Sequence, residues 1–199
     1  DRPAAPADAK NVVFVILTAV RRDHLSPYGA DPALTPYLST LASDGARFGD
    51  MIAASPFSRT SAVAFLTGHH AATLDMVEPG PGPEQRVLRD DVETLAERLE
   101  GAGWQTYGLT ANFNLNRATG MAQGFDRYRD SQANSFHPNT RIDGEKLVGA
   151  ALEALQKRTA EEEARPFYLQ LDLVDAHAPV RIVKDRSKDF DPDRPDAPY

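Results

Sequence analysis

The 199-residue sequence contains no cysteine, which excludes disulfide bonds, thiolate zinc sites and a cysteine nucleophile in one step. No apolar run approaches the ~20 residues that a membrane-spanning helix requires. Positive charge is also scarce, because 22 Lys and Arg residues stand against 29 Asp and Glu residues and leave a formal net charge of −7. This balance argues against a general nucleic-acid binder. An anionic substrate would therefore have to be held by local cations.

The remaining composition is that of an ordinary globular protein, with 41% hydrophobic and 26% charged residues. Its length suits one α/β domain with a sizeable core. Residues 1–10 are polar and rich in Pro and Ala, which predicts a flexible N-terminal segment without the apolar core of a signal peptide. This segment is either the tether left after a signal was removed or an arbitrary boundary. We expect a periplasmic or secreted protein, and a cytoplasmic location stays open.

Hydrophobic patterning predicts alternating strands and helices. A continuous apolar run typical of a buried strand occupies residues 11–17, and further strands are expected over residues 104–110 and 167–173. Helical patterns occupy residues 35–45, 90–101 and 141–158, and a short strand is expected over 47–54. Irregular segments are expected over 79–83 (PGPGP) and 120–139. The alternation predicts a three-layer α/β/α domain over residues 11–180 with a mostly parallel central sheet, followed by a polar, Pro-rich loop or truncated end over 181–199.

Polar groups follow each predicted strand, in residues 18–24, 55–58, 110–114 and 172–177. Ligands of parallel sheets bind at the carboxyl ends of the strands, so these groups are expected to share one rim. Asn112 is a candidate hydrogen-bonding group for a ligand, or else it stabilises the turn in which it lies. Asp172 and Asp175 are candidate acid/base groups, although Asp175 equally suits an ordering role in the turn before His177.

Ser58 lies where a polar turn becomes a helix of small residues that ends at Thr67 and Gly68. Unpaired backbone N–H groups and the positive end of the helix dipole favour an anion at such a place, so Ser58 is a candidate nucleophile or anion ligand. The alternative is that Ser58 only caps the helix. Arg21 and Arg59 are candidate anion-binding groups, because a guanidinium binds oxyanions with two parallel hydrogen bonds, or they are surface and structural residues.

Five stretches, in this order, resemble the N-terminal part of the sulfatase family within the alkaline phosphatase superfamily. They are NVVFVILTAVRRDHLSPYG, TPYLSTLASDGARF, SRTSAVAFLTG, DDVETLAERLEGAGWQTYGLTANFNL and PFYLQLDLVDAHAPV. The resemblance implies an alkaline-phosphatase-like fold, here incomplete at the C-terminus, and a metal-assisted hydrolase of sulfate or phosphate esters. It also implies that Ser58 lies at the nucleophile position and contacts the metal, and that His177 contacts the substrate; a core or loop-capping role for His177 is the alternative.

The sequence departs from the family pattern at groups that the chemistry requires. Thr18 replaces the expected metal-binding Asp, and a neutral hydroxyl is a poor ligand for Ca²⁺ or Mg²⁺, the divalent metals that the resemblance implies. Ala62 replaces the Arg of the nucleophile signature, and no Lys occurs in residues 111–114. Thr60 and Ala62 also break the signature for conversion to formylglycine, which favours a directly acting serine.

Two functions are therefore expected from the sequence. The first is a sulfatase-like hydrolase of small-molecule or glycan sulfate or phosphate esters with a degraded metal site. The second is a catalytically inactive, sulfatase-like binding domain, because a fold persists more readily than its chemistry.

Overall fold

The structure is a computed structural model that describes residues 2–76, 86–130 and 143–178. It contains a four-stranded parallel sheet in the order β1-β4-β2-β3. The strands are β1 (Val12–Leu17), β2 (Gln105–Thr110), β3 (Arg127–Arg129) and β4 (Phe167–Leu173). The α-helices are α1 (Pro36–Asp44), α2 (Ser58–Thr67), α3 (Leu95–Gly101), α4 (Gly144–Gln156) and α5 (Ala160–Glu163). Short 3-10 turns lie at Arg22–His24, Ser26–Tyr28, Ala71–Leu74, Phe113–Leu115 and Arg117–Thr119.

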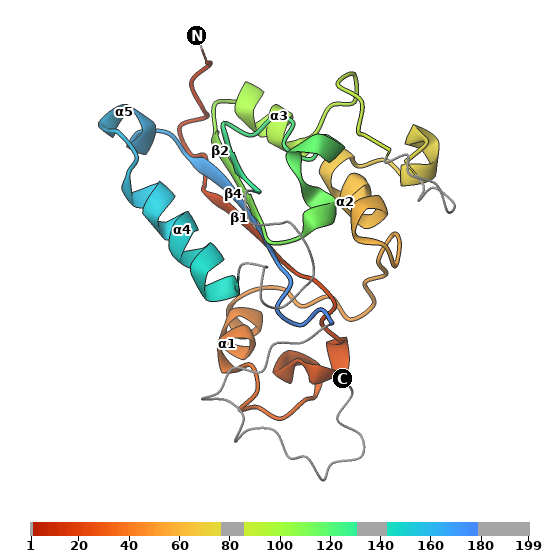
Figure 1. The fold of residues 1–199 in the computed structure, drawn as a ribbon. Helices are drawn as coiled ribbons and strands as arrows, with labels where there is room; N and C mark the ends of the chain where they lie inside the picture. The colour runs from red at the N-terminus through yellow and green to blue at the C-terminus, as the bar shows by residue number, and fades with distance from the viewer. Residues whose placement is uncertain (1, 77–85, 131–142, 179–199) are drawn as a thin grey trace.

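Helices cover both faces of the sheet, which gives the predicted three-layer α/β/α arrangement (Figure 1). On one face, α4 packs Leu147 and Ala151 against the apolar side chains of β2 and β4, among them Leu109 and Leu171. On the other face, α2 contributes Val63 and Leu66 to a second core. The chain alternates between strands and helices, so parallel pairing follows from crossover connections.

The three long strands and four of the helices lie close to the residues that the sequence predicts. The predicted strand over 47–54 is wrong, because this segment has no strand pairing in the structure. The helix predicted to begin at residue 90 begins instead at Leu95. The predicted irregular segment 120–139 contains the short strand β3, which pairs with β2. Residues 79–83 and 181–199 lie outside the described part of the chain.

β1 is an edge strand of this sheet and pairs only with β4 among the described strands. The apolar sequence of β1 predicts that both faces of the strand are buried. Among the described residues, however, side chains pack mainly against the face that is turned toward α2. Phe14 contacts Phe65 of α2, with ring centroids 5.3 Å apart. The side chains that face the α4 side remain exposed: Val13 (56%), Val15 (46%) and Leu17 (41%).

The N-terminus of α3 is held by a capping box. The Thr94 hydroxyl accepts a hydrogen bond from the Glu97 N–H (3.2 Å), and the Glu97 carboxylate accepts one from the Thr94 N–H (2.8 Å). Because Thr94 is buried, we expect Thr94→Ala to lower the free energy of unfolding by about 1–2 kcal/mol in urea denaturation. Thr94→Ser keeps the capping oxygen and should lose less than half as much. An equal loss in both variants would contradict capping as the cause.

Candidate functional site

The carboxyl ends of β1, β2 and β4 and the first turn of α2 surround one cavity of about 240 Å³. Its polar lining consists of Thr18, Ser55, Ser58, Ser61, Asn112 and Asp172. Four separate segments thus bring their polar groups to one rim, as the parallel topology requires. Aromatic and aliphatic side chains, including Phe57, Phe65 and Leu115, form the rest of the wall.

Ser58 is the first residue of α2, and the preceding Phe57 occupies the N-cap position. No side chain caps this helix, so the alternative that Ser58 is a helix cap does not hold. At the far end, Gly68 closes the helix in the left-handed conformation (φ 71°). The uncapped N–H groups of the first turn and the Ser58 hydroxyl therefore lie together at the positive end of a ten-residue helix.

Asn112 is fully buried at the end of β2. Its side-chain oxygen accepts a hydrogen bond from the Asn114 N–H (3.1 Å), which stabilises the turn. The side-chain Nδ2 has no hydrogen-bond partner among the described residues. Both roles predicted for Asn112 are therefore compatible with its geometry, since the oxygen serves the turn and a donor remains at the cavity.

Asp172, near the end of the central strand β4, is the one carboxyl group among the described residues that line the cavity. It is 1% exposed, and its Oδ1 accepts a hydrogen bond from the Thr18 hydroxyl (2.9 Å). Its Oδ2 has no partner among the described residues. Burial raises the pKa of Asp172 to about 7, against the lowering effect of the Thr18 hydrogen bond.

The backbone turns sharply where β1 ends at this cavity. Ala19 follows Thr18 with φ 63°, a left-handed conformation that residues other than glycine rarely adopt. Such strain persists where the surrounding structure enforces it, often beside a binding site. Thr18 and Ala19 both line the cavity, directly after β1 ends at Leu17.

The three remaining predicted site residues do not line this cavity. Arg21 is exposed and pairs with Asp23, the Arg21 Nε lying 3.0 Å from a carboxylate oxygen. Arg59 is buried, and its Nε donates to the Asn114 carbonyl (3.4 Å). His177 follows β4 in the chain, and its Nδ1 lies 2.6 Å from the Ala178 carbonyl oxygen. Substrate contact by these residues stays a prediction.

The described residues fit part of a cation site. No group of three Asp, Glu, His or Cys side chains that could hold a metal lies within the described ranges. The cavity nevertheless offers the unpartnered Asp172 oxygen and the hydroxyls of Thr18 and Ser58. Oxygen ligands suit Ca²⁺ or Mg²⁺ rather than Zn²⁺, although a full Ca²⁺ shell takes about 6–8 oxygens.

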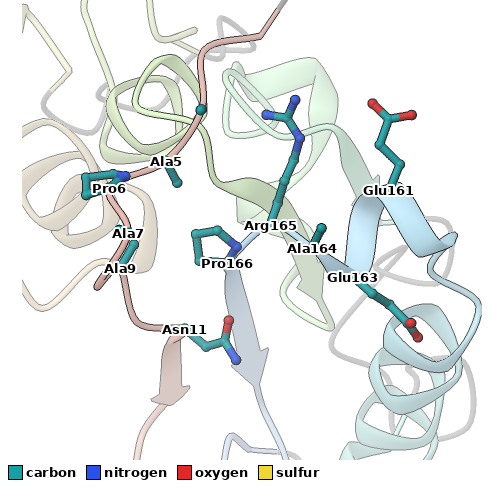
Figure 2. A pocket seen from close by; sticks show the side chains of 11 residues that line it. Ala5, Pro6, Ala7, Ala9, Asn11, Glu161, Glu163, Ala164, Arg165 and Pro166 are labelled. Carbon is teal, nitrogen blue, oxygen red and sulfur yellow. The ribbon is translucent and has the colours of Figure 1, made fainter.

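A second, larger hollow of about 520 Å³ lies at the opposite end of the strands (Figure 2). It is bounded by the N-terminal segment and by Asn11 and Pro166, which precede β1 and β4. Two polar side chains around it hold backbone atoms: Arg165 donates to the Pro3 carbonyl (2.9 Å), and Asn11 accepts from the Phe167 N–H (3.0 Å). Its position at the amino ends of the strands separates it from the polar rim.

Sequence reasoning named Asp172 together with Asp175 as a candidate acid/base group, and it missed that the Asp172 carboxyl would be almost fully buried in the lining of the cavity. The available signal was an acidic residue within the mostly apolar strand FYLQLDL. A charge at a position that the strand pattern buries is informative, because such groups are almost never fully buried without a partner. Ser61, one turn after Ser58 in α2, was also missed.

Comparison with known proteins agrees with this geometry. The family model described as Sulfatase matches residues 10–198. The chain is 26% identical over 140 residues to the steryl-sulfatase of Rattus norvegicus, an alignment that covers 63% of this chain and 24% of that protein. It is 25% identical over 143 residues to the N-acetylglucosamine-6-O-sulfatase of Bacteroides thetaiotaomicron, covering 69% and 24% respectively. The chain thus spans about a quarter of the length of these relatives.

Solved structures share the fold at lower identity. A protein solved in complex with its substrate D-glucosamine-2-N,6-O-disulfate superposes with a TM-score of 0.69 at 20% identity, covering 85% of this chain and 35% of the other. The phosphonate monoester hydrolase of Agrobacterium radiobacter gives a TM-score of 0.68 at 16% identity, covering 92% and 44%. With a family match over nearly its whole length, a parallel α/β/α fold and a polar rim at the strand ends, the chain belongs to the sulfatase family.

Proposed function

We propose that this chain forms the nucleophile-bearing part of a hydrolase that cleaves sulfate esters, or phosphate esters, of small molecules or glycans. The observation that carries the proposal is the position of Ser58. Its hydroxyl lies in the rim cavity at the uncapped start of α2, where an anionic ester is favoured. Family membership supports the reaction class, and the sulfated sugars bound by solved relatives support a glycan substrate.

In the proposed reaction, the Ser58 oxygen attacks the sulfur or phosphorus atom while the bond to the leaving alcohol oxygen breaks. The serine proton passes to the leaving oxygen, and water then hydrolyses the serine ester to restore Ser58. The first-turn N–H groups of α2 and the Asn112 Nδ2 donor would stabilise the oxyanion. A bound divalent cation would supply neutralisation of the ester charge and would lower the pKa of the nucleophile.

The second candidate function is a binding domain without catalytic activity. It is favoured by the hydrogen bond from Thr18 to Asp172, because this bond occupies one oxygen of the cavity's carboxyl group among the described residues. It is also favoured by residues 111–114, where Asn112 and Asn114 bond each other in place of the expected Lys. In this reading the cavity binds an anionic ester without cleaving it.

The two functions are separated by an assay with an aryl sulfate and an aryl phosphate. Turnover is measured in a protein that carries this chain together with the rest of the family's domain, with Ca²⁺ or Mg²⁺ and then with excess EDTA. We expect turnover that EDTA abolishes. Saturable ester binding without turnover in either condition would favour the inactive binding domain, and absence of both would contradict the proposal.

A further inference from the structure

The wall of the rim cavity is largely apolar. Besides the polar residues already named, its described lining consists of Ile16, Leu17, Ala19, Ala53, Pro56, Phe57, Phe65 and Leu115. These residues come from the end of β1, from the segment before α2, from α2 itself and from the turn after β2. An anionic ester group needs only the polar part of this wall, so the apolar part is available to the alcohol that the ester group carries.

The polar side chains of the described lining are short, and several already have partners. The Thr18 hydroxyl donates to Asp172 (2.9 Å). The Ser55 Oγ and the Asn112 side-chain oxygen each accept a hydrogen bond from a nearby backbone N–H (3.1 Å in both cases). No Lys, Arg, His, Gln, Glu or Tyr lies among the described lining residues. The polar groups that remain suffice for one ester group and leave little for further hydroxyls.

This distribution of polar and apolar groups separates two classes of alcohol. A sugar ring carries hydroxyl groups around its edge, and each enclosed hydroxyl without a hydrogen-bond partner costs binding free energy. An aryl or alicyclic ring carries none of them, and it gains free energy when it leaves water for an apolar wall. The described wall therefore fits an apolar ring better than a sugar.

Phe57 is placed to contact such a ring. It immediately precedes Ser58 and lines the cavity, yet its side chain is exposed. Among the described residues it belongs to neither hydrophobic core and contacts no other aromatic ring. Met51 and Ile52 are exposed as well and directly precede Ala53 of the lining. Exposed apolar side chains that gather beside a cavity are typical of a surface that binds an apolar group.

We propose that the rim cavity takes sulfate or phosphate esters of apolar, ring-containing alcohols, and that Phe57 determines this preference by contacting the ring. The inference rests on the proposed function, because the ester group occupies the cavity of Ser58. The volume of about 240 Å³ is below the ~300–1,000 Å³ of sites that enclose a drug-sized ligand. The cavity therefore encloses the ester group and the first ring, and a larger alcohol extends over the exposed segment 51–57.

The test measures binding, so that it does not depend on turnover. The 199-residue chain is titrated calorimetrically with naphthalene-2-sulfonate and with glucosamine 6-sulfate, and methanesulfonate is added as a competitor of the first. The two sulfonates present an anionic sulfur group whose C–S bond the proposed reaction does not cleave. We expect naphthalene-2-sulfonate to bind at least about tenfold more tightly than either other anion, because its rings bury apolar area. Methanesulfonate should displace it.

Phe57→Ala should weaken the binding of naphthalene-2-sulfonate at least about fivefold, because part of the apolar contact area is lost. The same variant should keep methanesulfonate binding within about threefold, since alanine leaves the backbone N–H groups at the start of α2 in place. Phe57→Leu should retain most of the preference. Tyr37→Ala removes an exposed aromatic side chain of α1 outside the described lining and is the matched control, which should bind like the wild type.

Three results would overturn the inference and leave the proposed hydrolase intact. They are binding of glucosamine 6-sulfate as tight as that of naphthalene-2-sulfonate, equal effects of Phe57→Ala and Tyr37→Ala, and naphthalene-2-sulfonate binding that methanesulfonate does not displace. Absence of saturable binding of all three anions would contradict the inference and the proposed function together. The expected binding pattern without turnover of any ester would contradict only the proposed hydrolase.

Discussion

We expect Ser58→Ala to lower kcat/KM for an aryl sulfate by at least about 10³-fold in the active protein, because a nucleophile cannot be replaced by a methyl group. Ser58 is the first residue of α2 and does not cap it, so the substitution leaves helix stability nearly unchanged. We expect Ser58→Ala to change the free energy of unfolding by no more than about 0.5 kcal/mol, as is usual for a substitution on the surface. Steady-state kinetics and urea denaturation on the same preparation measure the two effects.

Ser61→Ala is the matched control, because Ser61 lies one turn further along α2 and lines the same cavity. We expect it to change kcat/KM by less than about tenfold, as for a residue that contributes to the wall without reacting. Comparable losses in the two variants would indicate a general disturbance of the cavity. Full activity in Ser58→Ala would show that Ser58 is not the nucleophile.

Asp172→Asn is expected to stabilise the metal-free chain at pH 8 by up to a few kcal/mol relative to the wild type. In the unfolded chain the Asp172 carboxyl ionises near pH 4, whereas burial raises its pKa in the folded chain to about 7. Between these values the folded state binds the additional proton, so the free energy of unfolding falls as pH rises, by at most about 1.4 kcal/mol per pH unit. Above pH 7 the penalty stays constant.

Urea denaturation from pH 3 to pH 9 in the presence of EDTA checks this expectation. The wild-type and Asp172→Asn curves should meet near pH 3 and separate between about pH 4 and pH 7. Asp8→Asn, which removes an exposed carboxyl of the N-terminal segment, should run parallel to the wild type. A greater stability of the wild type at pH 8 would show that a donor or cation already compensates the Asp172 charge in the folded chain.

Much of the fold is predictable because the decisive signals are local. The apolar run that forms β1 and the amphipathic stripe of α4 are visible in the sequence without knowledge of their partners. β3 was not predictable in this way, because three residues with two exposed arginines have no strand pattern of their own and form a strand only by pairing with β2. Residues 47–54 are the opposite case. Their sequence predicts a strand, but they pair with none of the described strands and therefore form no strand there.

The candidate site is predictable only where one residue carries its own signal. Ser58 can be recognised as a candidate from the sequence because it stands at the start of a helix of small residues. Asn112 can be recognised because it lies in a polar turn that follows a predicted strand. The contact between Thr18 and Asp172 depends on β1 and β4 being neighbours in the sheet, which chain order does not reveal. Likewise, the separation of Arg59 from the cavity depends on which way the first turn of α2 faces.

The pairing of β1 has a consequence for how this protein is made. β1 leaves the ribosome well before β4, its partner among the described strands: the hydrogen bond from the Phe167 N–H to Asn11 spans 156 residues. At translation rates of roughly 5–20 residues per second, the nascent chain carries an unpaired apolar strand for on the order of ten seconds or more. We therefore expect the newborn chain to depend on holding chaperones until β4 emerges, and to aggregate when translated in extracts depleted of them.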